Sequence, residues 1–330
     1  MFWLLGDAPC KNPVCTSIVR TTDGGASFVG LPAPTAPLDT GSGGSGGSGG
    51  VNTIRFANAL DGYVFGSNQE GPFWETHDGG ELWTQPSAIS GQGLLSFGTG
   101  AGYAFALVGT CPGGSCSNIS LLRSPVSSDE WSPLNLPVPA GASIGAGMAV
   151  SGADVWVSLS ASQPKQMLLA SDDSGSTWTT YTSPCLSGLG GNLQATSASV
   201  LWAVCPTGML AGLMRSTDGG ANWQALTTAT PLPNSVLLAP SSGTDAVLAS
   251  AGQEQLELTT DGGTTWQKVS SPVTNGYWAW IGFTNASTGS ALSSASSAPA
   301  GWPWPNGPLP EQLWRTSDAG TNWTGPLSIG

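Results

Sequence analysis

The sequence predicts an all-β protein, a seven-bladed β-propeller with four antiparallel strands per blade, formed as a single domain over residues 1–330. Three observations support this prediction: a short motif recurs along the chain, its copies are evenly spaced, and the residues between copies resemble short strands. The motif is Ser or Thr, any residue, Asp, any residue, Gly, two residues and an aromatic. Its six copies are TTDGGASF at 21–28, THDGGELW at 76–83, SDDSGSTW at 171–178, STDGGANW at 216–223, TTDGGTTW at 259–266 and TSDAGTNW at 316–323.

The spacing of the motif is that of propeller blades. An eroded seventh copy ends at Trp131, with Val126 and Ser128 where the Asp and the last Gly would stand. The terminal aromatics lie 43–57 residues apart, at Phe28, Trp83, Trp131, Trp178, Trp223, Trp266 and Trp323. A period of about 40–50 residues with four short strands is typical of a propeller, in which each repeat buries its faces against its neighbours.

The strands are clearest in the fifth repeat. It reads NLQATSAS, VLWAVC, LAGLMRS, the motif and then WQALTT. The first three segments alternate or form short apolar runs bounded by Gly, Pro and Ser, as strands do. No segment has the pattern of an amphipathic helix.

The motif itself predicts a tight turn. An Asp at the first corner accepts hydrogen bonds from backbone N–H groups two residues on, Gly supplies positive φ, and the aromatic packs beneath the turn. We therefore expect the six motif aspartates to be structural rather than catalytic. They are Asp23, Asp78, Asp173, Asp218, Asp261 and Asp318.

Two features depart from the repeat in its first blade. Residues 41–50 read GSGGSGGSGG, a composition typical of an engineered flexible linker between blades one and two, although a natural Gly-rich loop is the alternative. Without those ten residues the first interval matches the others. The chain also opens on MFWLLGDAPC, which matches the second strand of other repeats. We therefore expect blade one to lack its inner strand, to offer an open edge to a strand donor, and the chain to carry no signal peptide.

Composition indicates an exported protein. The net charge is −12, from 8 Lys and Arg against 20 Asp and Glu, which argues against nucleic acid and anionic membranes as partners. No apolar run approaches the roughly 20 residues that span a bilayer. We expect a secreted or cell-surface monomer.

Six cysteines fall into three pairs. Cys10–Cys15 and Cys111–Cys116 occupy corresponding loops of the first and third repeats, and Cys185–Cys205 remain. An even count in matched loops predicts disulfides and an oxidising compartment, whereas six buried thiols are the alternative.

The motif resembles the Asp box, or bacterial neuraminidase repeat, and this resemblance covers nearly the whole chain. Sialidases of that group hold a substrate carboxylate with three converging arginines. Here four of the five arginines (Arg20, Arg123, Arg215 and Arg315) share one repeat position, eight residues before the aromatic, so they are expected on equivalent strands around the rim. The Arg-Ile-Pro signature is absent as well, which argues against sialidase activity. The chain also resembles photosystem assembly-factor and sortilin-type propellers, and this resemblance implies binding of peptides or proteins.

Catalytic signatures are sparse. The one histidine, His77, lies within a motif turn, which leaves no base for a nucleophilic triad, and one His without paired Cys-x-x-Cys argues against a zinc site. We expect no cofactor and no metal. If the loops between second and third strands face a ligand, the carboxylates Glu70, Glu254 and Glu311 are fallback candidates for glycoside hydrolysis, with solvated loop carboxylates as the alternative.

Aromatic residues in the seventh repeat are the candidate ligand contacts. Trp302 and Trp304 lie in GWPWPNGPLPEQLW at 301–314, where neighbouring prolines stiffen the loop. They are expected either to stack on a sugar or anchor a protein, or to fold back over the edge of the blade. Trp278 and Trp280 belong to GYWAWIGF at 276–283, where core packing is favoured for both, and Trp280 is kept as a further ligand candidate.

These observations favour a non-catalytic propeller that binds protein, peptide or glycan through its loop face. The alternatives are a glycoside hydrolase or lyase and a purely structural or engineered scaffold.

Overall fold

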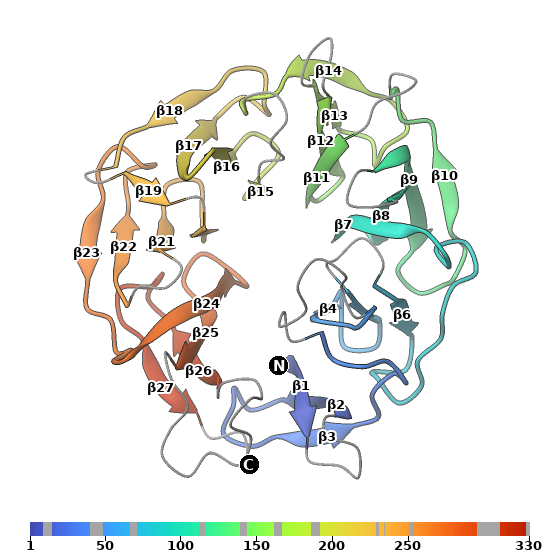
Figure 1. Cartoon of the computed structure of the whole chain (residues 1–330), viewed down its shortest axis with the longest axis horizontal. Helices are drawn as coiled ribbons and strands as arrows, with labels where there is room; N and C mark the ends of the chain where they lie inside the picture. Colours follow the sequence, from blue (N-terminus) through green and yellow to red (C-terminus); the bar gives the residue numbers. More distant parts are fainter. Residues whose placement is uncertain are drawn as a thin grey trace. The chain divides into compact units, whose positions relative to one another are not determined.

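The structure is a computed structural model that describes residues 1–8, 15–39, 49–66, 71–111, 116–138, 144–161, 167–185, 192–228, 231–233, 235–250, 254–295 and 311–327. These residues form strands and turns and no helix, which confirms the all-β prediction (Figure 1). The strands make seven consecutive antiparallel sheets in the blade pattern of a propeller. The chain divides into two compact units, one over Met1–Lys165 and Leu169–Thr180 and the other mainly over Tyr181–Ser328.

The first four sheets follow the chain in order. They comprise β1 (Phe2–Ala8), β2 (Cys15–Thr21) and β3 (Val29–Leu31); β4 (Thr53–Phe56), β5 (Gly62–Phe65) and β6 (Phe73–Thr76); β7 (Gly93–Gly100), β8 (Tyr103–Thr110), β9 (Ser117–Pro125) and β10 (Ser132–Leu134); and β11 (Ile144–Ser151), β12 (Asp154–Ala161), β13 (Met167–Ser171) and β14 (Thr179–Thr182).

The last three sheets repeat the same order. They comprise β15 (Asn192–Ala195), β16 (Leu201–Thr207), β17 (Leu210–Ser216) and β18 (Gln224–Leu226), with β19 (Leu232–Pro233) also paired to β17; β20 (Val236–Pro240), β21 (Ala246–Ser250), β22 (Leu256–Thr259) and β23 (Gln267–Val269); and β24 (Gly276–Phe283), β25 (Gly289–Ala295), β26 (Glu311–Thr316) and β27 (Thr324–Leu327).

The first sheet is three-stranded within the described residues, in the order β1-β2-β3. Its register pairs Phe2 with Thr21 and Ala8 with Cys15, so the segment that resembles a second strand occupies the end of the sheet. This agrees with the expected lack of an inner strand. The second sheet also has three named strands, and the Glu75–Thr84 bridge marks the position of its fourth.

Apolar side chains form the core between neighbouring sheets of each unit. In the first unit, Tyr63, Phe73, Phe97 and Trp131 belong to one cluster that joins the second sheet to the third. In the second unit, Trp278 belongs to a comparable cluster of buried residues. Each blade therefore depends on its neighbour for burial, as the repeat period predicts.

The motif residues form hydrogen-bonded hairpins. In the sixth repeat the Thr259 hydroxyl donates to Asp261 Oδ1 at 2.8 Å and accepts the Gly263 N–H at 2.9 Å. Asp261 Oδ1 also accepts the N–H of Thr265 at 2.9 Å. The expectation that each Asp accepts from N–H groups two residues on is therefore wrong, because the hydrogen bond to the Asp carboxylate spans four residues of the hairpin. All six motif aspartates accept the N–H four residues on, namely Asp23, Asp78, Asp173, Asp218, Asp261 and Asp318.

The strand β24 overturns one packing expectation. Trp278 is fully buried and its ring meets Trp314 edge-on, whereas Trp280 is 50% exposed. Residues two apart in a regular strand share a face, but the pairing of β24 with β25 shifts register between these two tryptophans. This β-bulge turns the side chains to different faces, so core packing is correct for Trp278 and wrong for Trp280.

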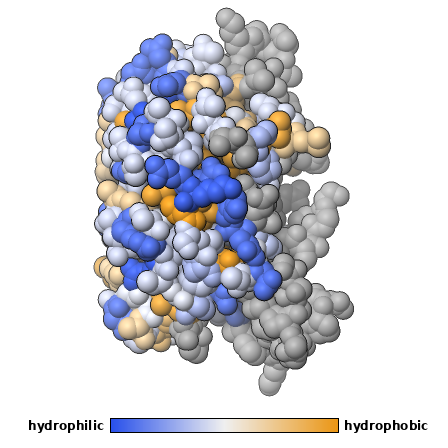
Figure 2. Space-filling view, turned by 90° about the vertical axis from the view of Figure 1, so that its left-hand side faces the viewer, coloured by the Kyte–Doolittle hydropathy of each residue, from blue (hydrophilic) through white to orange (hydrophobic). Residues whose placement is uncertain are grey.

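The surface of the second unit is mixed. Figure 2 shows hydrophilic and hydrophobic residues interspersed on the side where β18 and β23 lie. Among the described residues, no helix has the length and apolarity that a membrane crossing requires.

Candidate functional site

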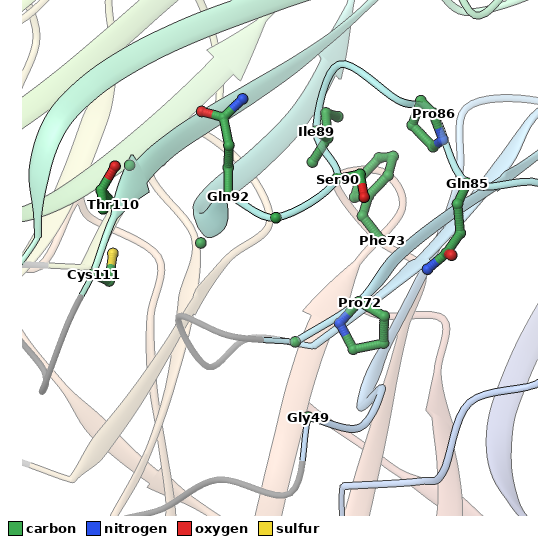
Figure 3. Close-up of a pocket in the computed structure, with 14 residues that line it drawn as sticks. Gly49, Pro72, Phe73, Gln85, Pro86, Ile89, Ser90, Gln92, Thr110 and Cys111 are labelled. Carbon is green, nitrogen blue, oxygen red and sulfur yellow. The ribbon is translucent and has the colours of Figure 1, made fainter.

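A cavity of about 500 Å³ opens between the second and third sheets, both within the first unit (Figure 3). It is bounded by the start of β6, the segment that leads into β7, and the end of β8. Its described lining residues are Gly49, Gly71, Pro72, Phe73, Gln85, Pro86, Ile89, Ser90, Gly91, Gln92, Gly93, Gly109, Thr110 and Cys111. In Figure 3, Thr110 and Cys111 lie at one end of the cavity and Gln85 and Pro86 at the other.

The described part of the cavity lining is polar but uncharged. Phe73 and Ile89 are buried members of the core cluster and supply an apolar floor. Gln85, Ser90 and Thr110 are exposed and supply amide and hydroxyl groups. No Asp, Glu, His, Lys or Arg occurs among the described residues that line it. The described lining therefore offers hydrogen-bonding groups over an apolar floor.

Local contacts hold the polar lining in place. The side-chain nitrogen of Gln92 donates to the carbonyl oxygen of Ala88 at 2.7 Å, and the Gln92 N–H donates to the carbonyl oxygen of Ile89 at 3.1 Å. These bonds close the segment before β7 into a compact turn. Its glutamine amide is consequently oriented at the cavity wall.

Two predicted disulfides are present. Cys111–Cys116 links the end of β8 to the start of β9 beside the cavity, and Cys185 bonds Cys205. Cys15 is also disulfide-bonded, while Cys10 lies outside the described residues. Disulfides are typical of an oxidising, extracytoplasmic environment.

A cluster of titratable side chains also joins the second sheet to the third. His77 Nδ1 lies 2.8 Å from Asp61 Oδ1, and His77 Nε2 lies 2.7 Å from Asp129 Oδ1. Glu75 lies next to them, and its Oε2 accepts the indole N–H of Trp131 at 3.0 Å. Three of these residues, Glu75, His77 and Asp129, place one potential metal ligand each within 4.8 Å of one another.

Burial controls the electrostatics of the cluster. Removal of the Glu75 carboxyl from water raises its pKa to about 7, against the opposing hydrogen bond from Trp131. Burial by itself would lower the pKa of His77, but hydrogen bonds to Asp61 and Asp129 outweigh it and hold that pKa above its usual value. Burial likewise raises the pKa of the nearby Tyr63 phenol, assisted by the charges of Glu75 and Asp61.

Glu75 interrupts a pattern that the other repeats follow. It stands eight residues before Trp83, where four repeats have arginine. The Arg123 guanidinium donates to the carbonyl oxygen of Ser174 in the next hairpin at 2.8 Å. Arg215 likewise donates to the carbonyl oxygen of Gly243 in the following repeat. In the second repeat this arginine-to-carbonyl link is replaced by a carboxylate-to-indole link to the eroded third hairpin.

Sequence reasoning missed this cluster. It treated His77 as an isolated turn residue and did not single out Glu75, Asp61 or Asp129. Two signals were present: an acid at the repeat position of the arginines, and Asp129 in the hairpin that has lost its motif Asp and Gly. Neither signal gives a distance, because the residues belong to different blades.

Two of the predicted site residues, Glu254 and Glu311, lie in the second unit and pair with neighbouring residues there. Glu254 accepts the N–H of Asn275 through Oε1, and its carbonyl oxygen accepts the indole N–H of Trp278 at 3.1 Å. Glu311 begins β26 and pairs with Ser294. Glu70, Trp302 and Trp304 lie outside the described residues.

Comparisons with known proteins support the architecture. No family model matches the chain, and no curated protein sequence matches it either. Among solved structures, YCF48 from Cyanidioschyzon merolae is 15% identical with a TM-score of 0.57, covering 90% of this chain and 88% of its own. A structure of a Mycobacterium tuberculosis puromycin-hydrolyzing peptidase is 14% identical with a TM-score of 0.58, covering 99% of this chain and 52% of its own.

A structure described as YCF48 bound to D1 peptide is 17% identical with a TM-score of 0.40, covering 74% of this chain and 88% of its own. The present chain spans about half the length of the peptidase chain. At these identities, the two matches with TM-scores above 0.5 show a shared β-propeller fold, and the fold alone.

Proposed function

We propose that this protein is a non-catalytic binding protein that recognises an extended, uncharged peptide segment in the cavity between its second and third sheets. The observation that carries the proposal is the composition of the cavity lining: amide and hydroxyl groups over an apolar floor, without a titratable side chain among the described lining residues.

The size and chemistry of the cavity suit a short peptide. A cavity of about 500 Å³ is within the range of about 300–1,000 Å³ of ligand pockets. The side-chain amides of Gln85 and Gln92 can each donate and accept, as the peptide main chain does. Phe73, Ile89 and Pro86 line the cavity and make its floor apolar, although each exposes little surface.

A glycan suits this cavity less well. Sugar rings stack on exposed aromatic faces, but Phe73 is 5% exposed and its ring is packed against Phe97 and Trp131. Hydrolysis of a glycoside needs two carboxyl groups in one site, and the described lining contains none. These points favour the peptide over the glycan and binding over catalysis.

The experiment is a peptide-library selection on the oxidised protein, followed by fluorescence polarisation with the best peptides. We expect Ser90→Trp, which fills the cavity, and the double variant Gln85→Ala/Gln92→Ala to weaken binding at least tenfold. Gln267→Ala removes an exposed glutamine from β23, outside the cavity lining, and should leave affinity unchanged.

Peptides that bind the Ser90→Trp variant as well as the wild type would disprove the assigned site. Turnover of any peptide or glycoside by the wild-type protein would disprove the non-catalytic assignment.

Three further assignments belong to the same proposal. The hydrogen-bonded hairpins support their identification as Asp boxes, and the disulfides support secretion. The end position of β1 in its sheet supports β1 as an acceptor for a strand from a partner protein. A synthetic β-strand peptide that binds and protects β1 amides from hydrogen exchange would test the last of these.

A further inference from the structure

We propose that Glu75, His77 and Asp129 form a binding site for a divalent transition-metal ion of the Zn²⁺ type, which joins the second sheet to the third hairpin. This inference is independent of the peptide cavity. It also reverses the expectation, drawn from the single histidine, that the chain has no metal site.

The ligand atoms are already gathered at close range. One atom from each of the three residues lies within 4.8 Å of the others. Ligands of a tetrahedral zinc ion with bonds of about 2.0 Å are about 3.3 Å apart. The 2.7 Å pair between His77 Nε2 and Asp129 Oδ1 therefore needs to open by about half an ångström, spacings as wide as 4.8 Å need to close by up to about 1.5 Å, and Asp129 is exposed enough to move.

A buried oxygen of Glu75 is the second, independent observation. The Glu75 side chain is fully buried, and while Oε2 accepts from Trp131, Oε1 has no hydrogen-bond donor among the described residues; the Asp129 carboxylate that interacts with Glu75 is an acceptor and raises the pKa of Glu75 further. Buried carboxylate oxygens are almost always satisfied, because leaving one unpaired is costly. A cation in the cluster supplies the missing partner of this oxygen.

The surroundings of the three ligands match those of known metal sites. A metal-bound histidine usually donates its other ring N–H to a carboxylate, and a ligating carboxylate is itself hydrogen-bonded. Here Asp61 Oδ1 lies 2.8 Å from His77 Nδ1, and Asp61 Oδ2 accepts from the side chain of Asn58 at 2.6 Å. This pair holds the imidazole with Nε2 toward Asp129.

The donor set selects the class of metal. One imidazole and two carboxylates suit Zn²⁺ and similar ions, whereas Mg²⁺ and Ca²⁺ prefer oxygen ligands alone. The ion displaces the proton on His77 Nε2, which leaves to solvent. The His77 side chain is 28% exposed and that of Asp129 is 52% exposed, so the ion and a water ligand can enter from outside.

The test uses tag-free protein that has been stripped with a chelator and then titrated with Zn²⁺ by calorimetry and with Co²⁺ by visible absorption. We expect one ion per chain and the intense visible bands of tetrahedral Co²⁺. Glu75→Gln and His77→Ala should each weaken binding at least 100-fold. Asp61→Asn should weaken it about 10–100-fold, as loss of an outer-shell partner does. Glu130→Gln, which neutralises the exposed neighbour of Asp129, is the matched control and should bind like wild type.

The unmodified protein provides a readout that needs no variant. It has one histidine, so a ¹⁵N spectrum of the imidazole contains a single ring. Bound Zn²⁺ should leave the ring with a single N–H, at Nδ1, and with Nε2 coordinated to the metal. A ring whose Nε2 keeps its proton with excess Zn²⁺ would overturn the proposal and identify the cluster as a proton-bridged Asp–His–Asp link. Equal Zn²⁺ affinity of the wild type and Glu75→Gln would overturn it too.

Discussion

Thr259→Val tests whether the motif hydroxyl, rather than the motif sequence as a whole, stabilises each hairpin. Valine keeps the shape of threonine and removes only the hydroxyl. That hydroxyl is buried in a residue that is 1% exposed, donates to Asp261 and accepts the Gly263 N–H. The variant therefore loses these two short hydrogen bonds and a longer one from the Asp261 N–H at 3.4 Å, and it leaves the buried Gly263 N–H unsatisfied.

The expected magnitude follows from these contacts. The lost bond to Asp261 is worth about 1 kcal/mol net, and the unsatisfied Gly263 N–H costs about 1–3 kcal/mol. We expect Thr259→Val to lower the free energy of unfolding by about 2–4 kcal/mol in urea titrations followed by tryptophan fluorescence. Hydrogen exchange at Gly263 and Thr265 should accelerate, because the opening is local.

Thr260→Val is the matched control, because Thr260 is the exposed neighbour of Thr259. It should change the free energy of unfolding by less than about 0.5 kcal/mol. A loss below about 1 kcal/mol for Thr259→Val, or an equal loss for both variants, would refute the assigned role of the buried hydroxyl.

Three more predictions concern single contacts. Hydrogen bonds from Thr265 lower the pKa of Asp261 to about 2. The stabilisation from its carboxylate is therefore complete above the ordinary pKa of 3.8 and is lost as the pH falls through about 2. An NMR titration of the carboxyl carbon measures this pKa, and a midpoint near 3.8 would contradict the prediction. Ala319 has a φ of +59° at a motif position where most other repeats have glycine. Ala319→Gly should therefore raise the free energy of unfolding by about 0.5–1 kcal/mol in urea titrations, whereas the control Ala221→Gly should not raise it. Removing the disulfide with Cys111→Ala/Cys116→Ala should loosen the cavity rim and weaken peptide affinity severalfold, and unchanged affinity would show that the rim is not part of the binding site.

The repeat made the fold readable from sequence because its signals are local. Each hairpin is specified by a hydroxyl, an Asp, a Gly and an aromatic within eight residues, and each strand by its own alternation. The structure confirms the sheets at the expected intervals and two of the three cysteine pairs. The local rule failed at Trp280, where one extra residue in β24 reversed the side-chain alternation.

Sequence alone therefore determined the all-β repeat architecture, the acidic charge and the Cys111–Cys116 pair in its short loop, because each depends on residues close together in the chain or on composition. Only the tertiary structure decided the cavity and the Glu75–His77–Asp129 cluster. Asp129 comes from a different blade than the other two residues, and the cavity exists only where the second and third sheets face each other. Which side chains meet across neighbouring blades depends on how the sheets pack. The distance between side chains of two blades cannot be read from the spacing of any one motif.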